Sequence, residues 1–141
     1  MRAYHFVGDT LRDGRPVPAD GEWLEHAGPV VMCERGLHAS EHPFDALQYA
    51  PYASGTTLCL VEVAALLFDE DKVCGNRRMI VKRIEAEQLL REFARWCALE
   101  VIHLWDAPDV VVRYLQTGDP ELREEAAAEA RAAAATAGRA E

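Results

Sequence analysis

The densest cluster of reactive side-chain types lies between Cys33 and His42, in the run CERGLHASEH. This short stretch holds a thiol, two imidazoles and a hydroxyl group, and three interpretations of it are open. In the first, Cys33, His38 and His42 ligate zinc, which thiolate and imidazole suit, although closed structural zinc sites use four ligands. A proline at position 43 and a helix start between the histidines would spoil a shared helical face. We therefore predict no metal site.

The second interpretation is a pocket for a small ligand at His38. We expect this residue at the junction between a short strand and a helix capped by Ser40. Backbone N–H groups that follow such a cap lack intrahelical partners, which suits phosphate or another anion. The third interpretation is structural, with His38 as a hydrogen-bonded, half-buried side chain of the short strand.

Two further polar residues stand on expected strands. By alternation, Glu62 shares a face with Leu58 and Leu60, and its carboxylate is either at the exposed rim of a sheet or directed into a cleft. His5 could reach the same cleft only if the first strand neighbours the strand of Glu62. Two histidines and a carboxylate could orient a sugar and stabilise a developing cation. The candidate catalytic residues are His38, Glu62 and His5, and the candidate ligand-binding residues are Ser40, Tyr49 and Tyr52.

The elements that must position these residues are short strands in the first half of the chain. β-Branched and alternating runs bounded by Gly, Pro and Asp predict them. We expect strands at 3–7, 23–24, 30–33, 37–39, 56–63 and 79–84, with loops over 9–21 and 69–78. Apolar residues on both faces of 56–63 predict a central, doubly covered strand. A short helix should run from the Ser40 cap to Pro51.

The second half of the chain is patterned as helices. Apolar residues recur at helical spacing from Ala86 to Trp105, which indicates one buried face. A turn at Asp106 should precede a helix that ends at Gly118, and Asp119-Pro120 should open a third helix. From Ala126 onward the chain is nearly all Ala with Glu and Arg, which favours a helix but buries little area.

These patterns together predict an α+β fold. A small, mostly antiparallel, twisted sheet with one short helix is followed by two or three C-terminal helices that pack on it. We expect a single domain over residues 1–118, with the sheet in 1–84 and helices in 86–118. Residues 119–141 should form an Ala-rich helical tail that either frays in solvent or binds a partner.

Composition narrows the classes of function. The chain has 141 residues, with 15 Lys and Arg against 24 Asp and Glu, a net charge of -9. This acidic balance disfavours duplex nucleic acid and an anionic membrane as partners. No apolar run approaches the roughly 20 residues of a membrane span, and no secretory signal is visible, so we expect a cytoplasmic protein. The four cysteines form no Cys-x-x-Cys pair, which argues against a zinc ribbon or a thioredoxin-type motif.

The segment 31–40, followed by Pro43, Asp45, Ala46, Leu47 and Tyr49, resembles the core of an uncharacterised family of small phage, prophage and bacterial proteins. Members of that family carry a CERGFHA-like motif, a strand similar to 59–63, a charged loop and a strand similar to 79–82. Many end in helical tails rich in Ala, Trp, Asp and Arg. The resemblance covers about residues 1–118 and implies a phage-linked setting, without an assigned activity.

At the level of fold, the order of elements is similar to the core of ADP-ribosyltransferase-like domains. The similar features are a strand with GLHA, a short helix, and a strand ending in VEV. By position, this resemblance implies that His5 contacts a ribose, that His38 stands where a residue usually stacks on nicotinamide, and that Glu62 is a loose counterpart of the catalytic glutamate. The long helix usual between the first two strands is absent, and no NAD-binding loop is evident.

Two functional hypotheses follow. The first is a phage- or prophage-associated accessory protein that acts as a protein-interaction module, binding a partner or a second copy through its C-terminal helices. The alternative is a binder of a nucleotide-like or NAD-like small ligand, or an ADP-ribosyltransferase-like enzyme, with its pocket at His38 and walls from Glu62 and Tyr49 or Tyr52. The residues do not specify a cofactor.

Overall fold

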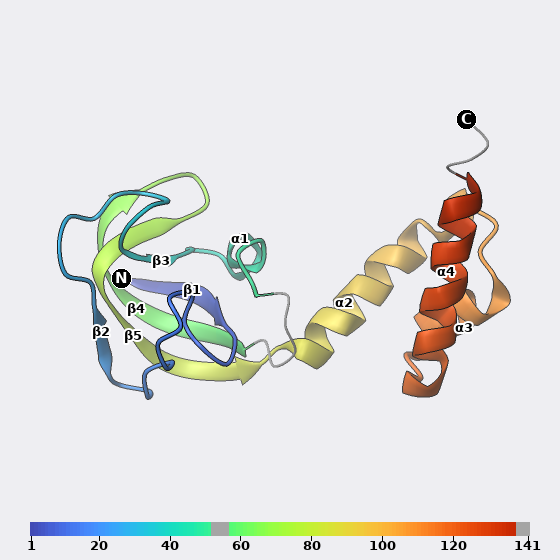
Figure 1. Cartoon of the computed structure of the whole chain (residues 1–141), viewed down its shortest axis with the longest axis horizontal. Helices are drawn as coiled ribbons and strands as arrows, with labels where there is room; N and C mark the ends of the chain where they lie inside the picture. Colours follow the sequence, from blue (N-terminus) through green and yellow to red (C-terminus); the bar gives the residue numbers. More distant parts are fainter. Residues whose placement is uncertain (52–56, 138–141) are drawn as a thin grey trace. The chain divides into compact units, whose positions relative to one another are not determined.

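The computed structural model describes residues 1–51 and 57–137. These residues form a five-stranded antiparallel sheet followed by helices (Figure 1), so the predicted α+β class is confirmed. The chain divides into two compact units, residues 1–87 and 88–141. The domain boundary expected after residue 118 falls inside the second unit, and the packing of the helices on the sheet stays a prediction.

The sheet of the first unit has the strand order β1-β4-β5-β2, and β3 also pairs with β5. Its strands are β1 (Arg2–Val7), β2 (Trp23–Glu25), β3 (Leu37–Ala39), β4 (Thr57–Phe68) and β5 (Val73–Glu85). All pairings are antiparallel. Because β1 pairs with β4, His5 stands opposite Cys59. The first strand and the strand of Glu62 are therefore neighbours, which was the condition for His5 to reach a site there.

The long β4–β5 hairpin contradicts one prediction. The loop expected over 69–78 is wrong, because β4 continues to Phe68 and only a tight turn separates it from β5. The N–H of Asp69 donates to the carbonyl of Lys72 at 2.9 Å and closes this turn. The charged residues of 76–78 do not form a loop, because strand alternation sends Arg77 outward and Arg78 inward.

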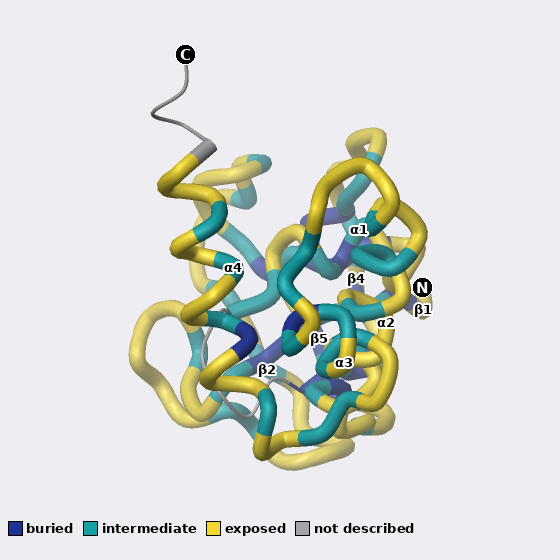
Figure 2. Tube along the Cα trace, turned by 90° about the vertical axis from the view of Figure 1, so that its right-hand side faces the viewer, coloured by how far each residue is buried: buried dark blue, intermediate teal, exposed yellow. Residues whose placement is uncertain are grey.

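The hairpin bends, and the sheet curls over its core. The register of β4 against β5 shifts after Leu60 and twice between Ala64 and Leu67, and such bulges increase local twist. Beyond β3, Ser40 pairs with Tyr4 of β1 through two backbone hydrogen bonds of 2.7 and 2.8 Å. The buried segments of the chain are dark blue in Figure 2. The core cluster contains no aromatic residue and consists of Ala3, Val7, Ala39, Cys59, Val61, Val63, Val73 and Ile80.

Two local predictions near the site are wrong. Residues 30–33 do not form a strand, because the chain turns back on itself and Val31 pairs with Arg35. Ser40 does not cap a helix, because its backbone is already used in pairing with β1. Helix α1 (Pro43–Leu47) instead begins after His42, which makes no side-chain capping bond. The proline in its first turn fixes this later start.

The second unit is built from helices. These are α2 (Glu87–Glu100), η1 (Ile102–Leu104), α3 (Asp109–Thr117), η2 (Pro120–Leu122) and α4 (Arg123–Ala137). Gly118 ends α3 in the left-handed conformation, at φ 70°, as predicted. Asp119 accepts a hydrogen bond from the N–H of Glu121 at the start of η2. The α4 helix packs on α3 and buries Ala126, so the Ala-rich segment has a partner within this unit. Among the described helices, none has the length and apolarity required to span a bilayer.

We expect Gly36→Ala to destabilise the protein more than Gly28→Ala. Both glycines have positive φ, 123° and 102°, so both substitutions introduce backbone strain. A Cβ at position 36 would also lie 2.5 Å from Cys74 Sγ, whereas a Cβ at position 28 meets nothing within 4 Å. Overpacking of this kind costs about 1–3 kcal/mol, which urea denaturation of the two variants would measure. Equal losses would show that β3 moves away from β5 without cost.

Candidate functional site

A cavity of about 840 Å³ opens in the first unit. Its walls come from β1, from residues 10–15, from the turn and strand over 33–40, and from the end of α1. Single side chains of Leu24, His26, Lys72 and Arg78 complete the lining. All of these residues belong to the unit of residues 1–87. The volume falls within the range of about 300–1,000 Å³ that is typical of small-molecule sites.

The lining is electropositive although the chain as a whole is acidic. Five lining side chains are Lys or Arg and two are Asp or Glu, against a net charge of -9 for the chain. The five cations are Arg12, Arg15, Arg35, Lys72 and Arg78. One of the two carboxylates, Asp13, already forms an ion pair of 2.7 Å with Arg15. The cavity therefore concentrates positive charge that its own carboxylates do not balance.

Arg78 is the most deeply placed of these cations, with 6% of its surface exposed. It stands opposite Val63 on the inner face of β5. Its Nη1 donates to the carbonyl of His38. Arg78 forms no ion pair with a carboxylate of the described chain. Burial lowers its pKa to about 10, so it stays charged at neutral pH. A buried cation without a counter-charge is costly, and an anion in the cavity would offset that cost.

His5 lies on the same inner face, between Ala3 and Val7 of β1. Burial, followed by the charges of Arg78 and His38, holds the pKa of His5 well below its ordinary value. The ring is therefore neutral at neutral pH. Within the described residues the ring makes no hydrogen bond, its nitrogens are not among the fully buried unpartnered atoms, and His5 lines the cavity. His5 is thus a neutral group in the cavity with free bonding capacity.

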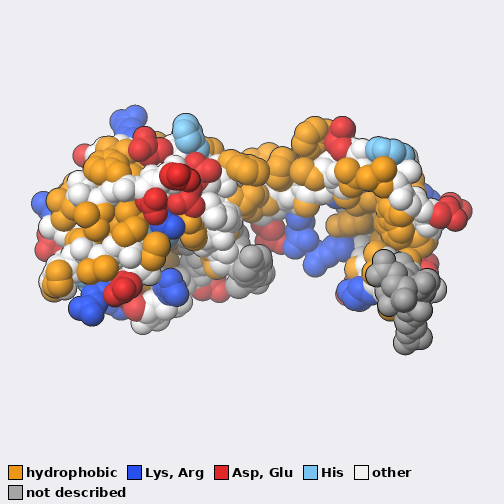
Figure 3. Space-filling view, turned by 90° about the horizontal axis from the view of Figure 1, so that it is seen from above, with side chains coloured by type: hydrophobic (Ala, Val, Ile, Leu, Met, Phe, Trp, Pro, Cys, Tyr) orange, Lys and Arg blue, Asp and Glu red, His pale blue; other side chains and the backbone are white. Residues whose placement is uncertain are grey.

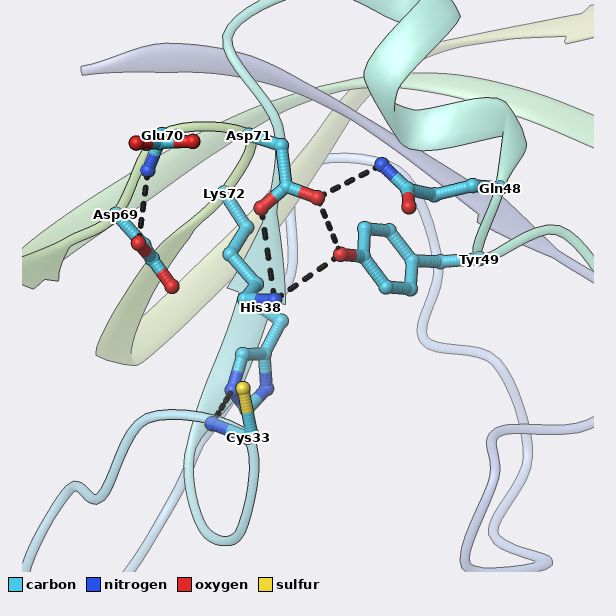
Figure 4. A network of polar contacts seen from close by, with 8 residues as sticks. All are labelled: Cys33, His38, Gln48, Tyr49, Asp69, Glu70, Asp71 and Lys72. Carbon is cyan, nitrogen blue, oxygen red and sulfur yellow. Dashed lines mark hydrogen bonds and ion pairs between the residues drawn. The ribbon is translucent and has the colours of Figure 1, made fainter.

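His38 also lines the cavity, but its ring is engaged by its own turn. Its Nε2 accepts a hydrogen bond of 3.1 Å from the N–H of Cys33, a residue with φ of 65° (Figure 4). The backbone of Gly36 favours the charged form of this ring. Burial and the charge of Arg78 lower the pKa of His38. His38 therefore combines the structural role and the ligand-pocket role that the sequence leaves open. Its ring holds the turn at Cys33, and this turn forms one wall of the cavity.

A polar network forms the rim of the cavity. Asp71 Oδ2 accepts hydrogen bonds from Tyr49 Oη at 2.5 Å and from Gln48 Nε2 at 2.7 Å. Lys72 Nζ donates to Tyr49 Oη at 3.0 Å and lies 3.5 Å from Asp71 Oδ1. The side chain of Cys33 also raises the pKa of Lys72. These contacts join the end of α1 to the β4–β5 turn (Figure 4).

The structure gathers some of the predicted site residues and separates others. His5, His38, Ser40 and Tyr49 line the cavity. Glu62 does not line the cavity. It stands opposite Arg2 in the β1–β4 register, on the other face of β4, and its side chain is exposed. Tyr52 lies outside the described residues. Within residues 1–51 and 57–137, no group of three or more His, Cys, Asp or Glu side chains is placed to hold a metal ion.

Sequence reasoning missed Arg78, Lys72 and Asp71. All three lie in the segment 69–78, which the sequence pattern predicts as a loop. One signal could have found Arg78: the adjacent pair Arg77-Arg78 lies between runs of strand-forming residues. Two consecutive strand residues point to opposite faces, so one of these arginines must face inward. Arg77 is the outer one, 3.2 Å from Glu25 and 4.6 Å from the ring centre of Trp23.

Comparison with known proteins gives one match. Residues 1–92 match the family of domains of unknown function designated DUF7666. No curated protein and no solved structure matches the chain. The matched region contains the whole first unit, and with it every residue of the cavity.

The free energy of unfolding should fall as the pH is lowered below about 6.5. His5 and His38 have lowered pKa values in the folded protein, whereas the unfolded chain protonates near the ordinary pKa of about 6.5. Below that pH the unfolded state binds more protons, so stability is complete above about pH 6.5 and is lost on acidification. Urea denaturation between pH 5 and 7.5 measures the slope.

His5→Asn should flatten this slope, because it removes the more strongly shifted group. His103→Asn is the matched control, since His103 is exposed in η1 of the second unit. A slope that both variants leave unchanged would show that His5 is not protonated on unfolding in this range.

Proposed function

This chain belongs to the DUF7666 family, and we propose that it binds a small anionic molecule in the cavity of its first unit. The observation that carries the proposal is Arg78, a buried guanidinium that faces the cavity without a carboxylate partner. Guanidinium groups bind phosphate and carboxylate through paired N–H donors. A ligand of that class would supply the missing counter-charge.

The surroundings of Arg78 support a small ligand more than a macromolecule. The arginine lies at the inner face of the sheet, out of reach of a flat polymer surface, and the cavity has the volume of a small-molecule site. His26 also lines the cavity, and its Nε2 is the one buried side-chain polar atom in the described chain without a hydrogen-bond partner. Such an atom is costly unless a ligand or water meets it.

The lining also accommodates an uncharged part of the ligand. Phe6, Val7, Leu11 and Leu24 contribute apolar surface beside the cations. A nucleotide-like molecule combines an anionic group with a ring of this character. We propose binding rather than ADP-ribosyl transfer, because Glu62 lies outside the cavity. The interpretation that a helix capped by Ser40 binds the anion is replaced by one in which Arg78 does so.

We expect AMP, ADP, NAD or ADP-ribose to raise the unfolding temperature of the wild-type protein, and Arg78→Met to lose that effect. Arg77→Met is the matched control, because it removes the neighbouring arginine from the outer face. Ligand at 100 times its dissociation constant stabilises by about 2.7 kcal/mol. Thermal unfolding followed by circular dichroism measures the shifts.

The same experiment reports whether Arg78→Met folds. Without ligand the variant should be about as stable as the wild type, since replacing an unpaired buried charge with an apolar group is often neutral or stabilising. A wild-type protein that no anionic ligand stabilises at millimolar concentration would refute the proposed function.

A second candidate is self-association through the C-terminal helices, favoured by the surface of α2. None of its residues is buried, and Leu89 and Trp96 are 59% and 57% exposed. Hydrophobic side chains follow the surface of this helix (Figure 3). Apolar helix faces of this kind pair with one another. The phage-linked accessory role implied by the sequence resemblance stays a prediction.

If a second copy covers this face, the mass measured by sedimentation equilibrium should rise toward that of a dimer as concentration increases. Trp96→Gln should weaken the association at least about tenfold, which corresponds to 1.4 kcal/mol. Trp23→Gln, on the outer face of the first unit, should not weaken it. A monomer mass at every concentration up to about 1 mM would contradict self-association.

A further inference from the structure

We infer that the cavity recognises a tetrahedral dianionic group, such as the terminal phosphate or sulfate of a ligand, and that His5 takes up one proton when this group binds. The inference rests on the proposed function and specifies the chemistry of its ligand. It also makes binding dependent on pH, with tighter binding at lower pH.

The first support is the position of His5 and Arg78. One comes from β1 and the other from β5, on either side of β4, and both lie on the inner face. Both line the cavity, and the charge of Arg78 lowers the pKa of His5.

Of the five cations that line the cavity, Arg78 is the buried one. Arg12, Arg15 and Arg35 are exposed, and Lys72 is bound to Tyr49 and Asp71. A monoanion at Arg78 is therefore balanced without His5. A dianion needs a second positive charge, and protonation of His5 supplies it.

The second support is that His5 is the histidine free to change its protonation state. The Nε2 of His38 accepts a hydrogen bond from the Cys33 N–H, and protonation of this nitrogen would break that bond. The Nε2 of His26 has no accessible surface and cannot touch a ligand without movement. His5 has neither restriction.

The third support is the charge around His5. Arg78 disfavours a proton on the ring of His5, and no carboxylate is among the groups that shift the pKa of His5. Glu85, opposite Thr57 on the same face as His5, is exposed and accepts a hydrogen bond from Thr57 Oγ1. The groups that face His5 from its neighbours are Cys59 of β4, His38 of β3, Arg78 of β5, and Arg12, Asp13 and Arg15 of the loop after β1. Asp13 is paired with Arg15, Asp45 of α1 does not line the cavity, and Glu34 and Arg35 are exposed at the turn.

A dianion reverses this balance. Placed between Arg78 and His5, it cancels the repulsion and accepts a hydrogen bond from the protonated ring, both of which favour the charged imidazole. By linkage, proton uptake on binding means that affinity rises as pH falls through the range in which the free His5 is neutral. The proton comes from solvent, and no covalent bond is made or broken.

The test is a proton NMR titration of the five histidines in the full-length protein. The titration is run with sodium sulfate and, at equal ionic strength, with sodium perchlorate. Sulfate is a tetrahedral dianion, perchlorate is a tetrahedral monoanion, and neither titrates between pH 5 and 8. The His5 ring signal is assigned by its loss in His5→Asn. We expect sulfate to raise the titration midpoint of His5 by about one pH unit or more and perchlorate to leave it unchanged.

Arg78→Met should abolish the sulfate effect, and the midpoint of the exposed His42 should not move in any sample. A sulfate effect of equal size on every histidine, or none on His5, would overturn the inference. If nucleotides still stabilise the wild type in a manner that depends on Arg78, the proposed function stands while this inference falls. If neither nucleotides nor sulfate bind, the proposed function falls with it.

Discussion

The buried guanidinium of Arg78 constrains the rest of the first unit. It is held on the inner face of β5 by a bond to the carbonyl of His38, in a sheet whose core is made of Ala, Val, Cys and one Ile. Those residues allow the β4–β5 hairpin to curl and to bring β1 and β3 close to each other. The curl encloses the arginine, and the cavity leaves space beside it. The buried charge of Arg78 and the cavity beside it therefore both result from the curl of the β4–β5 hairpin.

The rigid and adjustable parts of the site are built differently. Its floor consists of strands joined by backbone hydrogen bonds, including the pair that links Ser40 to Tyr4. Its rim consists of side chains, with Asp71 at the centre of contacts from Gln48, Tyr49 and Lys72. Exposed side-chain contacts of this kind contribute little to stability and exchange readily with water. The floor keeps its geometry whether or not the rim is closed.

Much of the fold was predictable because its signals are local. Alternation placed β1, β2 and β3, and Gly118 ended α3 in the left-handed conformation. The errors arose where pairing across the sheet outweighed local preference. Ser40 is a good helix cap by residue type, but pairing with Tyr4 consumed its backbone. The polar segment 73–78 has a loop-like composition, but its partners on β2, β3 and β4 make it a strand.

Some residues of the candidate site could be predicted from the sequence and others could not. The sequence placed reactive groups at His5 and His38, and both line the cavity. It could not separate Glu62 from them, because the face on which a strand residue lies is decided by what covers each side. It also could not tell Arg78 from Arg77, because alternation sends one of these neighbours inward without showing which one. Only the long-range register, with Arg78 opposite Val63, shows which way the side chain points.

The network around Asp71 joins two segments that are distant in sequence, the end of α1 and the tip of the β4–β5 hairpin. Tyr49 and Lys72 belong to this network and also line the cavity. A ligand that took up their hydrogen-bonding groups would loosen the contact between α1 and the hairpin, so the mouth of the cavity and the position of α1 depend on the same few side chains.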